Sequence, residues 1–260
     1  PISDYLTDED LSIVDKASLM ETNWDGKQWG IPAYGFTYGI AYDKDAMRTA
    51  GVDPEKPFET WDEFMDCCQK IKASGISPLG MGLKDGYLPA WIGIFLGQQN
   101  LDSVNDIIDL MNGKTSFTDK KNSEWLYKIQ ELLDAGYIND DILSLDFYQG
   151  QQLIESGKAA MTLHTQAYAV SLEKSKGADK IGFAKAPVYG NGKLANSIAS
   201  PSQVYVIPKS AKHKEAAADF LLFLQEEDNI KCLYEMANVI MPNVNFKEEW
   251  LTSEIDKQVM

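Results

Sequence analysis

Short apolar runs alternate with longer amphipathic segments along the chain, and this alternation constrains the fold more than any other feature. Apolar runs of strand type occur at 38–42, 159–163 and 203–207, whereas 61–71 and 216–224 carry apolar residues at helical spacing. Strand and helix signals that alternate in this way are typical of α/β proteins, in which helices cover a sheet. We therefore predict an α/β fold.

Several element ends are predicted from local chemistry. Thr60 precedes a helix whose third residue is Glu63, which is the pattern of a capping box. We also expect a helix from Thr7 to Met20, a helix capped by Ser210, and a hairpin-type turn at 189–192, between two flanking strands. Further helices are expected over 45–50, 88–96, 123–135 and 147–155.

The charge balance excludes some classes of partner. The 260 residues include 24 Lys and Arg against 39 Asp and Glu, a formal net charge of −15. Nucleic-acid binders need a basic face that displaces counterions, and no basic run here exceeds two residues. An anionic membrane surface is disfavoured for the same reason. No apolar stretch approaches the ~20 residues that span a bilayer.

No motif for a metal, a nucleotide or covalent catalysis stands out. Cys67, Cys68 and Cys232 form no CxxC pair, and two histidines do not make a usual zinc site without cysteine. Gly113-Lys114-Thr115 imitates a phosphate-binding loop, but Ile108 occupies the required upstream glycine position. We expect no cofactor, no metal and no enzymatic activity, and we expect Cys67 or Cys68 to pack as a small apolar residue.

Seven short motifs occur in the order in which one protein family carries them. They include Asp25-Gly26-Lys27, Gly30-Ile31-Pro32, Tyr42-Asp43-Lys44-Asp45, Thr60-Trp61-Asp62-Glu63-Phe64, Gly75-Ile76-Ser77-Pro78, Gly157-Lys158-Ala159-Ala160-Met161 and the run from Ile207 to Ala217. Together they resemble the extracellular solute-binding proteins of ABC importers, specifically the family 1 sugar-binding proteins that include maltose-binding protein. Asp43 departs from the family, which usually has Asn at that position.

The resemblance implies a periplasmic-binding-protein-like (type II) fold, with two α/β lobes joined by hinge strands. It assigns 1–36 and 204–250 to an N-lobe, 37–203 to a C-lobe, and 251–260 to the start of a C-terminal helical segment. Family members carry a βαβ segment before the first motif. The resemblance therefore predicts an N-terminally truncated chain with an incomplete N-lobe.

The resemblance also implies a function. The expected role is to bind a carbohydrate, a neutral sugar or an oligosaccharide, outside the cytoplasm, and to deliver it by hinge closure to the membrane permease of an ABC transporter. The protein is expected to be a monomer, either periplasmic or a lipoprotein anchored at the outer face of the cell membrane. A carbohydrate-active enzyme and a non-transport ligand sensor that use the same cleft remain alternatives.

Sugar capture needs aromatic faces for the C–H face of the ring and polar groups for the hydroxyls. The resemblance assigns candidate contacts in four segments, namely Tyr34, Phe36 and Tyr38; Tyr87 and Trp91; His164, Gln166 and Tyr168; and Ser202 and Gln203. Tyr168 matches the family's stacking tryptophan after a one-residue shift. Hydrophobic core is the alternative role for the aromatic residues. These segments contain no Arg or Lys, which favours a neutral sugar over an anionic one.

Overall fold

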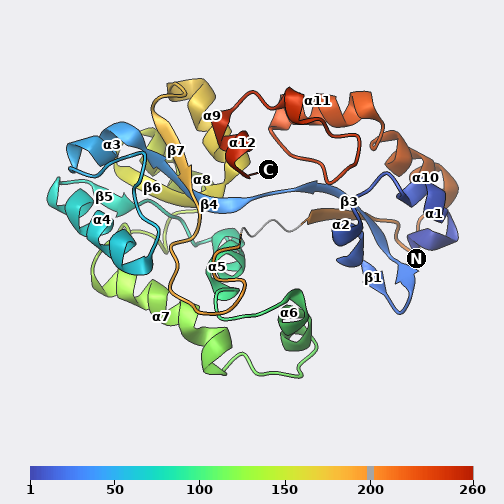
Figure 1. Ribbon diagram of the computed structural model, residues 1–260, viewed down its shortest axis with the longest axis horizontal. Coiled ribbons are helices and arrows are strands. Elements are labelled where there is room, and N and C mark those ends of the chain that lie inside the picture. Colours follow the sequence, from blue (N-terminus) through green and yellow to red (C-terminus); the bar gives the residue numbers. More distant parts are fainter. Residues whose placement is uncertain (198–201, 260) are drawn as a thin grey trace. The chain divides into compact units, whose positions relative to one another are not determined.

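The computed structural model describes residues 1–197 and 202–259, and the chain divides into two compact units (Figure 1). Unit 1 comprises Pro1–Thr37 and Ser200–Met260, and unit 2 comprises Tyr38–Ala199. From the sequence, the boundaries between the two lobes were expected after residues 36 and 203, and residues 251–260 were expected to form a separate segment. In the structure these last residues belong to unit 1.

Unit 2 is built on a four-stranded sheet in the order β5-β6-β4-β7. Its strands are β4 (Tyr38–Asp43), β5 (Ser77–Leu79), β6 (Ala159–Thr165) and β7 (Ile181–Ala184). β6 pairs in parallel with β5 and antiparallel with β4, and β4 pairs antiparallel with β7. All seven residues of β6 are buried, as expected of a strand that is covered on both faces.

The described part of unit 2 also contains seven helices. They are α3 (Lys44–Thr49), α4 (Trp61–Ala73), α5 (Tyr87–Gly97), α6 (Val104–Met111), α7 (Lys120–Asp134), α8 (Phe147–Glu155) and α9 (Gln166–Lys176). Of these, α3, α4, α5, α8 and α9 pack on the sheet. The capping box at the start of α4 is confirmed, because the Thr60 hydroxyl accepts from the Glu63 amide and the Glu63 carboxylate accepts from the Thr60 amide. α6 and α9 were not expected from the sequence.

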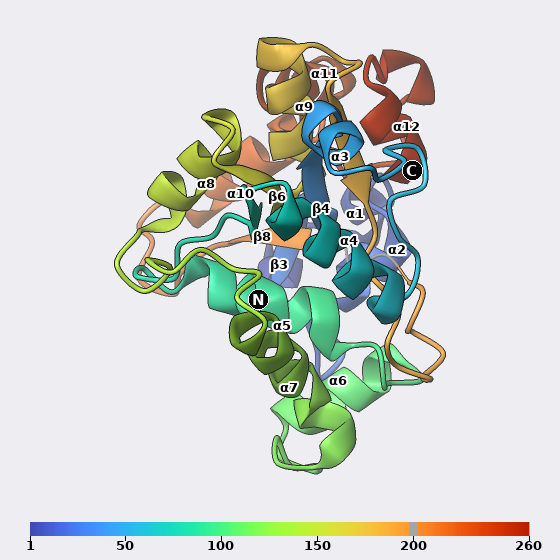
Figure 2. The same cartoon turned by 90° about the vertical axis from the view of Figure 1, so that its left-hand side faces the viewer.

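Two glycines allow α8 to lie directly on a neighbouring backbone segment. A Cβ atom added at Gly150 would approach the Gly82 backbone to under 3.0 Å, and one added at Gly82 would meet the Asp146 carbonyl oxygen just as closely. A glycine on α5 has more space around it, at the place where α5 and α7 lie side by side (Figure 2). A Cβ added at Gly93 would lie 3.7 Å from the Trp125 ring, which is an ordinary van der Waals contact. Close packing therefore fixes α8 but leaves space on α5.

Unit 1 combines small sheets with short helices. β3 (Gly30–Gly35) pairs antiparallel with β8 (Ser202–Val206), and β1 (Asn23–Trp24) forms a hairpin with β2 (Lys27–Gln28). Its helical elements are η1 (Ile2–Asp4), α1 (Asp8–Leu11), α2 (Lys16–Met20), α10 (Lys214–Phe223), α11 (Glu227–Ala237), η2 (Glu248–Trp250) and α12 (Glu254–Val259). One core cluster joins Ile2, Leu6, Leu11, Val14, Ile31, Ala218 and Leu221.

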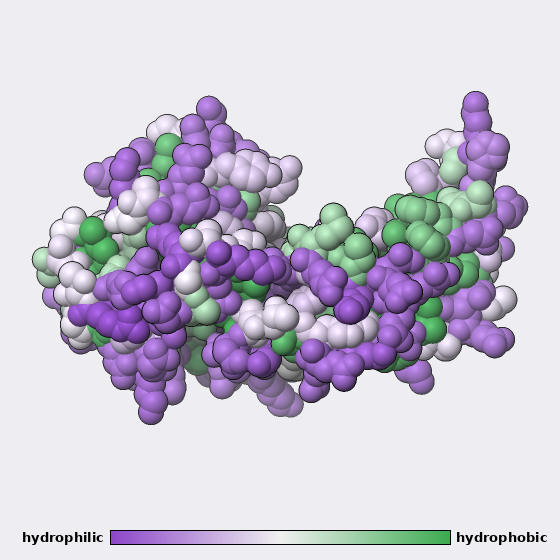
Figure 3. All heavy atoms as spheres, turned by 90° about the horizontal axis from the view of Figure 1, so that it is seen from above, coloured by the Kyte–Doolittle hydropathy of each residue, from purple (hydrophilic) through white to green (hydrophobic). Residues whose placement is uncertain are grey.

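The C-terminal part of unit 1 is held by a buried hydrogen bond. The Tyr234 hydroxyl of α11 donates to the Asp256 carboxylate of α12 at 2.7 Å. Burial is the main cause that raises the pKa of Tyr234 to about 12, so the hydroxyl keeps its proton at neutral pH. On the surface, hydrophobic residues gather over α10 and α11 (Figure 3), where Phe220, Phe223 and Met236 are exposed.

The expected helix from Thr7 to Met20 is wrong, because the chain forms two helices there. Val14 leaves the helical path to form an isolated β-bridge with Asn243, which is far away in the sequence. The Asp15 carboxylate then accepts from the Ser18 amide and begins α2. A tertiary pairing therefore overrides a continuous helical pattern.

Two other expectations are also wrong. Ser210 caps no helix, since α10 begins at Lys214 with His213 at the N-cap position. The segment 189–192 forms no hairpin turn, because its flanking strands pair with different partners, β7 with β4 and β8 with β3. The amides of Tyr189 and Gly190 instead donate to the side-chain oxygen of Gln99, which is fully buried.

The three cysteines are free thiols in different surroundings. Cys67 and Cys68 are buried in α4, which confirms the expected packing role, and Cys232 in α11 is exposed. Burial raises the pKa of Cys67 to about 12 and raises that of Cys68 as well. Among the described residues, no helix is long and apolar enough to cross a membrane.

The contact between Gly150 and Gly82 gives a test of how α8 is held. We expect Gly150→Ala to destabilise the protein by about 1–3 kcal/mol, because the added methyl group has no space beside a backbone segment. Gly93→Ala is the matched control, and there better helix propensity should stabilise by up to about 1 kcal/mol. Urea-induced unfolding measures both, and equal stability of the two variants would contradict the close packing described above.

Candidate functional site

Aromatic rings from five elements of unit 2 meet in one group, here called the aromatic cluster. Its members are Tyr38, Tyr87, Trp91, Phe147, Tyr148, His164 and Tyr168. They come from β4, α5, α8, β6 and α9. Neighbouring ring centroids lie between 4.0 Å, for His164 and Tyr168, and 6.2 Å, for Tyr87 and Phe147.

The inner part of the aromatic cluster rests on two paired strands. Tyr38 at the start of β4 is 5% exposed, and His164 near the end of β6 is 6% exposed. The strand register pairs Tyr38 with Thr165 and therefore brings the two rings to the same end of the sheet. Burial raises the pKa of Tyr38 to about 12, so this residue stays a neutral phenol.

The outer part of the aromatic cluster is exposed to solvent. Trp91 is half-buried and packs edge-to-face on Phe147, with centroids 5.1 Å apart, while it also contacts Tyr38 and His164. Tyr87 on α5 is 61% exposed and Tyr148 on α8 is 68% exposed. The exposed fraction of the rings therefore increases from the inner to the outer part of the aromatic cluster, and the exposed ring faces are available to an apolar surface of a ligand.

Polar groups border the aromatic cluster on one side. The single hydrogen of the Tyr168 hydroxyl is shared between two acceptors, the Glu155 carboxylate at 3.1 Å and the backbone carbonyl oxygen of Gln151 at 3.3 Å. Burial, with the adjacent Glu155 charge as the smaller cause, raises the pKa of Tyr168. The Gln151 side-chain amide lies 2.6 Å from His164 Nε2. The side chains of Gln151 and Glu155 on α8 thus contact the rings of His164 on β6 and Tyr168 on α9.

His164 is held as a neutral ring. The Thr165 amide donates to its Nδ1 at 2.8 Å, and its ring stacks on Tyr168 with an interplanar angle of 28°. Burial lowers the pKa of His164 to about 3, because the charged imidazolium would lose its hydration in this position. The ring therefore stays uncharged at any pH near neutrality.

The candidate residues fall into both units. Unit 2 brings together Tyr38, Tyr87, Trp91, His164 and Tyr168 in the aromatic cluster. Gln166, the first residue of α9, is in unit 2 but is fully buried, so its role as a ligand contact stays a prediction without an exposed surface to support it.

The remaining candidates lie in unit 1. The rings of Tyr34 and Phe36 pack edge-to-face at 5.2 Å. Tyr34 pairs with Gln203, and Gly35 with Ser202, in the β3–β8 ladder. Tyr34 and Phe36 are half-buried and Gln203 is exposed. Their role as ligand contacts stays a prediction.

None of the site residues that α8 contributes was predicted from the sequence. Phe147, Tyr148, Gln151 and Glu155 contact the aromatic cluster or its polar border, although 147–155 was predicted as a helix with the right bounds. The one available signal was the Phe147-Tyr148 pair in the first turn, directly after the capping Asp146. It gives no indication of which distant residues the helix meets.

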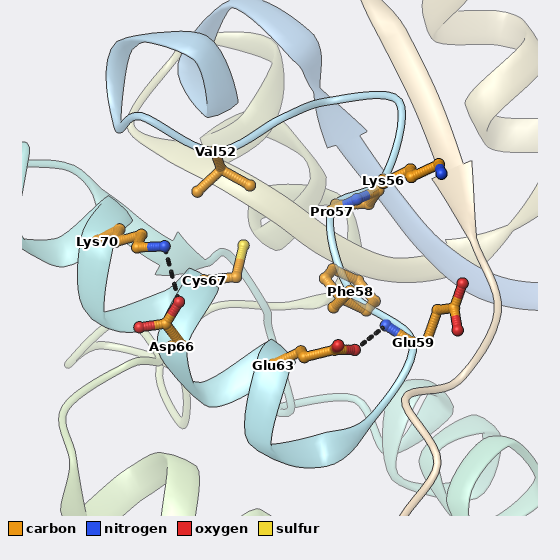
Figure 4. A pocket seen from close by; sticks show the side chains of 9 residues that line it. All are labelled: Val52, Lys56, Pro57, Phe58, Glu59, Glu63, Asp66, Cys67 and Lys70. Atoms are coloured by element: carbon orange, nitrogen blue, oxygen red, sulfur yellow. Dashed lines mark hydrogen bonds and ion pairs between the residues drawn. The ribbon is translucent and has the colours of Figure 1, made fainter.

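A hollow of about 300 Å³ lies beside the start of α4 (Figure 4). Glu63 points into the capping turn, where it accepts from the amides of Glu59 and Thr60, and Asp66 pairs with Lys70 at 2.8 Å. Phe58 packs on Phe64 in the core. These carboxylates are committed to local structure, so this hollow is a weaker candidate than the aromatic cluster. Within the described ranges, no group of three or more potential metal ligands occurs.

Comparison with known proteins decides the family. Residues 1–231 match the family of bacterial extracellular solute-binding proteins. The chain belongs to this family. Its members are binding proteins and not enzymes, which agrees with the expectation of a binding role over a catalytic one.

Individual relatives are distant and longer than this chain. The sn-glycerol-3-phosphate-binding periplasmic protein UgpB of Brucella melitensis is 25% identical over 236 residues, which cover 88% of this chain and 52% of the relative. The chain therefore spans about half the length of the curated relatives it matches.

Solved structures of solute-binding proteins confirm the fold. A chitin oligosaccharide binding protein has a TM-score of 0.80 at 23% identity, and the match covers 100% of this chain and 64% of that one. The solute receptor AcbH, described with a substrate preference for β-D-galactopyranose, has a TM-score of 0.72 at 17% identity, with coverage of 99% and 63%. The predicted α/β periplasmic-binding-protein fold is thereby confirmed.

Because His164 is buried in its neutral form, the free energy of unfolding is expected to depend on pH. The unfolded chain binds a proton at an ordinary histidine pKa near 6.5, whereas the folded chain does so only near 3. The unfolded state therefore holds more protons in between, and unfolding becomes easier as pH falls, by about 1.4 kcal/mol per pH unit for this one group.

Unfolding free energies measured between pH 6.5 and 4.5 test this, because ordinary carboxyl groups titrate mostly below that range. We expect His164→Gln to remove the slope that this ring contributes. The exposed His213 at the start of α10 supplies the control, and His213→Gln should keep the wild-type slope. Identical slopes in wild type and His164→Gln would refute a neutral buried ring.

Proposed function

We propose that this chain binds a neutral carbohydrate for an ABC importer, and that the aromatic cluster of unit 2 is a contact surface for the sugar. The proposal rests on the change in exposure across the aromatic cluster, in which Tyr38 and His164 are buried whereas Tyr87 and Tyr148 are exposed. The amide of Gln151 and the carboxylate of Glu155 lie at the border of these rings. Membership of a solute-binding family supports binding rather than catalysis.

The chemistry of a sugar fits this surface. One face of a pyranose ring presents C–H groups, which pack on an aromatic face, and the ring edge presents hydroxyls, which need hydrogen-bond partners. The rings of Tyr87, Trp91 and Phe147 supply the first kind of surface. The polar side chains on the same border supply the second kind.

The charge of the site favours a neutral ligand. No Lys or Arg takes part in the described ring contacts of the aromatic cluster or in the hydrogen bonds of Gln151, His164 and Tyr168, whereas the carboxylate of Glu155 does. A phosphate or carboxylate ligand would require a basic partner there. The solved relatives described as binding chitin oligosaccharide and galactopyranose support the same choice.

A phosphorylated polyol is the second candidate ligand. It is favoured by the curated relatives, several of which are named as sn-glycerol-3-phosphate-binding proteins. The described ring contacts and hydrogen bonds of the aromatic cluster, which include no Lys or Arg side chain, argue against it. The two ligand classes differ by about 1.5–2 negative charges at neutral pH, so one binding experiment separates them.

The wider role is part of the same proposal. Delivery of the sugar to the membrane permease of an ABC transporter, outside the cytoplasm, is supported by the family's extracellular character and by the periplasmic relatives. Unit 1 would then correspond to the N-lobe and unit 2 to the C-lobe. Hinge closure, lipid anchoring and a monomeric state stay predictions.

A thermal-shift and calorimetric titration with galactose, maltose, N,N′-diacetylchitobiose and sn-glycerol 3-phosphate tests the ligand class. At 100 times its dissociation constant a ligand stabilises the folded state by about 2.7 kcal/mol, which is measurable as a higher melting temperature. We expect a shift with a neutral sugar and none with sn-glycerol 3-phosphate. A shift with the phosphate alone would overturn the choice of a neutral ligand.

Tyr87 offers a substitution that separates binding from folding. Because its ring is 61% exposed, Tyr87→Ala should leave the melting temperature almost unchanged while it weakens sugar binding by about tenfold, the loss of one stacked ring. Tyr127→Ala is the matched control, since Tyr127 is an equally exposed tyrosine on α7 of the same unit. Equal affinities of the two variants would show that Tyr87 does not touch the sugar.

A further inference from the structure

Two nitrogen atoms face each other at hydrogen-bond distance beside the aromatic cluster. His164 Nε2 and the side-chain nitrogen of Gln151 lie 2.6 Å apart. An amide nitrogen carries two hydrogens and accepts no hydrogen bond, so this contact requires an imidazole Nε2 that accepts. Whether it accepts depends on the tautomer of the ring, which the opposite nitrogen decides.

The other side of the ring fixes that tautomer. The Thr165 backbone N–H donates to His164 Nδ1 at 2.8 Å, and the Thr165 hydroxyl lies 3.3 Å from the same atom. Because a backbone N–H is always a donor, Nδ1 must be the acceptor, and the neutral ring then carries its proton on Nε2. A proton on Nδ1 instead would point at the amide hydrogen of Thr165.

The tautomer in turn assigns the amide of Gln151. A protonated Nε2 donates, and within this side chain only the oxygen accepts, so the amide must be turned by 180° to place its oxygen towards His164. Its NH2 group then faces away from the ring. In the described part of the chain no protein donor is bonded to the outward end of the Gln151 side chain, so no protein donor opposes an NH2 group at that position.

The position of this donor suits a ligand. Gln151 is half-buried and follows Phe147 by four residues on α8, which places both side chains on one face of the helix. Phe147 is the ring that joins Tyr87, Trp91 and His164 in the aromatic cluster. The donor therefore lies beside the surface on which the sugar is proposed to stack.

We propose that Gln151 is a specificity-determining residue whose amide, held by His164, presents an N–H donor to a ligand oxygen at the border of the aromatic cluster. This inference rests on the proposed sugar-binding function and names one residue that reads the sugar. The ligand atom it fits is an oxygen acceptor, which a hydroxyl, a ring oxygen or an acetamido carbonyl supplies. His164 acts as a positioning residue, since it orients the amide and is itself buried.

Nuclear magnetic resonance tests the tautomer without any ligand. The chain has only two histidines, so His213→Gln leaves His164 as the single source of imidazole ¹⁵N signals. Long-range ¹H–¹⁵N spectra at pH 7 distinguish a ring protonated on Nε2 from one protonated on Nδ1. We expect the Nε2–H form, and the Nδ1–H form would overturn the assignment of the amide.

Binding measurements test the role of the donor. Gln151→Glu keeps an oxygen that accepts from His164 but replaces the NH2 group by a second oxygen, and Gln151→Met removes the donor without adding charge. Calorimetric titration with galactose, maltose and N,N′-diacetylchitobiose should show affinity reduced by about tenfold or more in both variants. Gln152→Glu is the matched control, because Gln152 is the exposed neighbour on the same helix and should bind as wild type does.

The outcomes separate this inference from the proposed function. Wild-type affinity in Gln151→Glu and Gln151→Met, when the wild type binds one of these sugars, would overturn the role of Gln151 and leave the proposed function intact. If the wild type binds none of the three sugars, both fail together, and the tautomer experiment still decides whether His164 holds the amide. Melting temperatures of all variants confirm that each is folded during the titration.

Discussion

The candidate site depends on the position of strand β6. This strand is buried along its whole length, between a parallel neighbour and an antiparallel one, and a shift of register by one residue would exchange its two faces. Its last residues are His164 and Thr165. The Thr165 hydroxyl then accepts from the Tyr168 amide and begins α9, so the same two residues end a strand, cap a helix and orient the stacked pair of rings.

Features that depend on neighbours in the sequence were predictable, and features that depend on distant contacts were not. The capping box at Thr60 and the bounds of α8 were predicted because a few adjacent residues determine them. The expected helix from Thr7 to Met20 failed at Val14, which pairs with a residue more than two hundred positions away. In the site, the aromatic candidates of α5, β6 and α9 were identified by resemblance. The contribution of α8 was missed because its place is set by the close approach of Gly150 to Gly82.

The aromatic cluster combines rigidity with exposure. Its rings are carried by strands and helices rather than by loops. Trp91, Phe147 and His164 at its centre each contact at least three other rings, so these three side chains have little freedom to lose when a ligand arrives. The inner members are dry and neutral, because burial opposes ionisation of both Tyr38 and His164. A surface of this kind recognises shape and hydrogen-bonding pattern more than charge.

The unequal burial of the three thiols has a practical consequence for studying this protein. Only the thiolate form of cysteine reacts readily with alkylating reagents, and Cys67 and Cys68 are both enclosed in α4 with their ionisation suppressed. Cys232 stands exposed on α11, in the other unit. A maleimide dye added to the native chain therefore reports from one defined position, and its fluorescence can follow the surroundings of α11 during a titration without any cysteine having to be removed first.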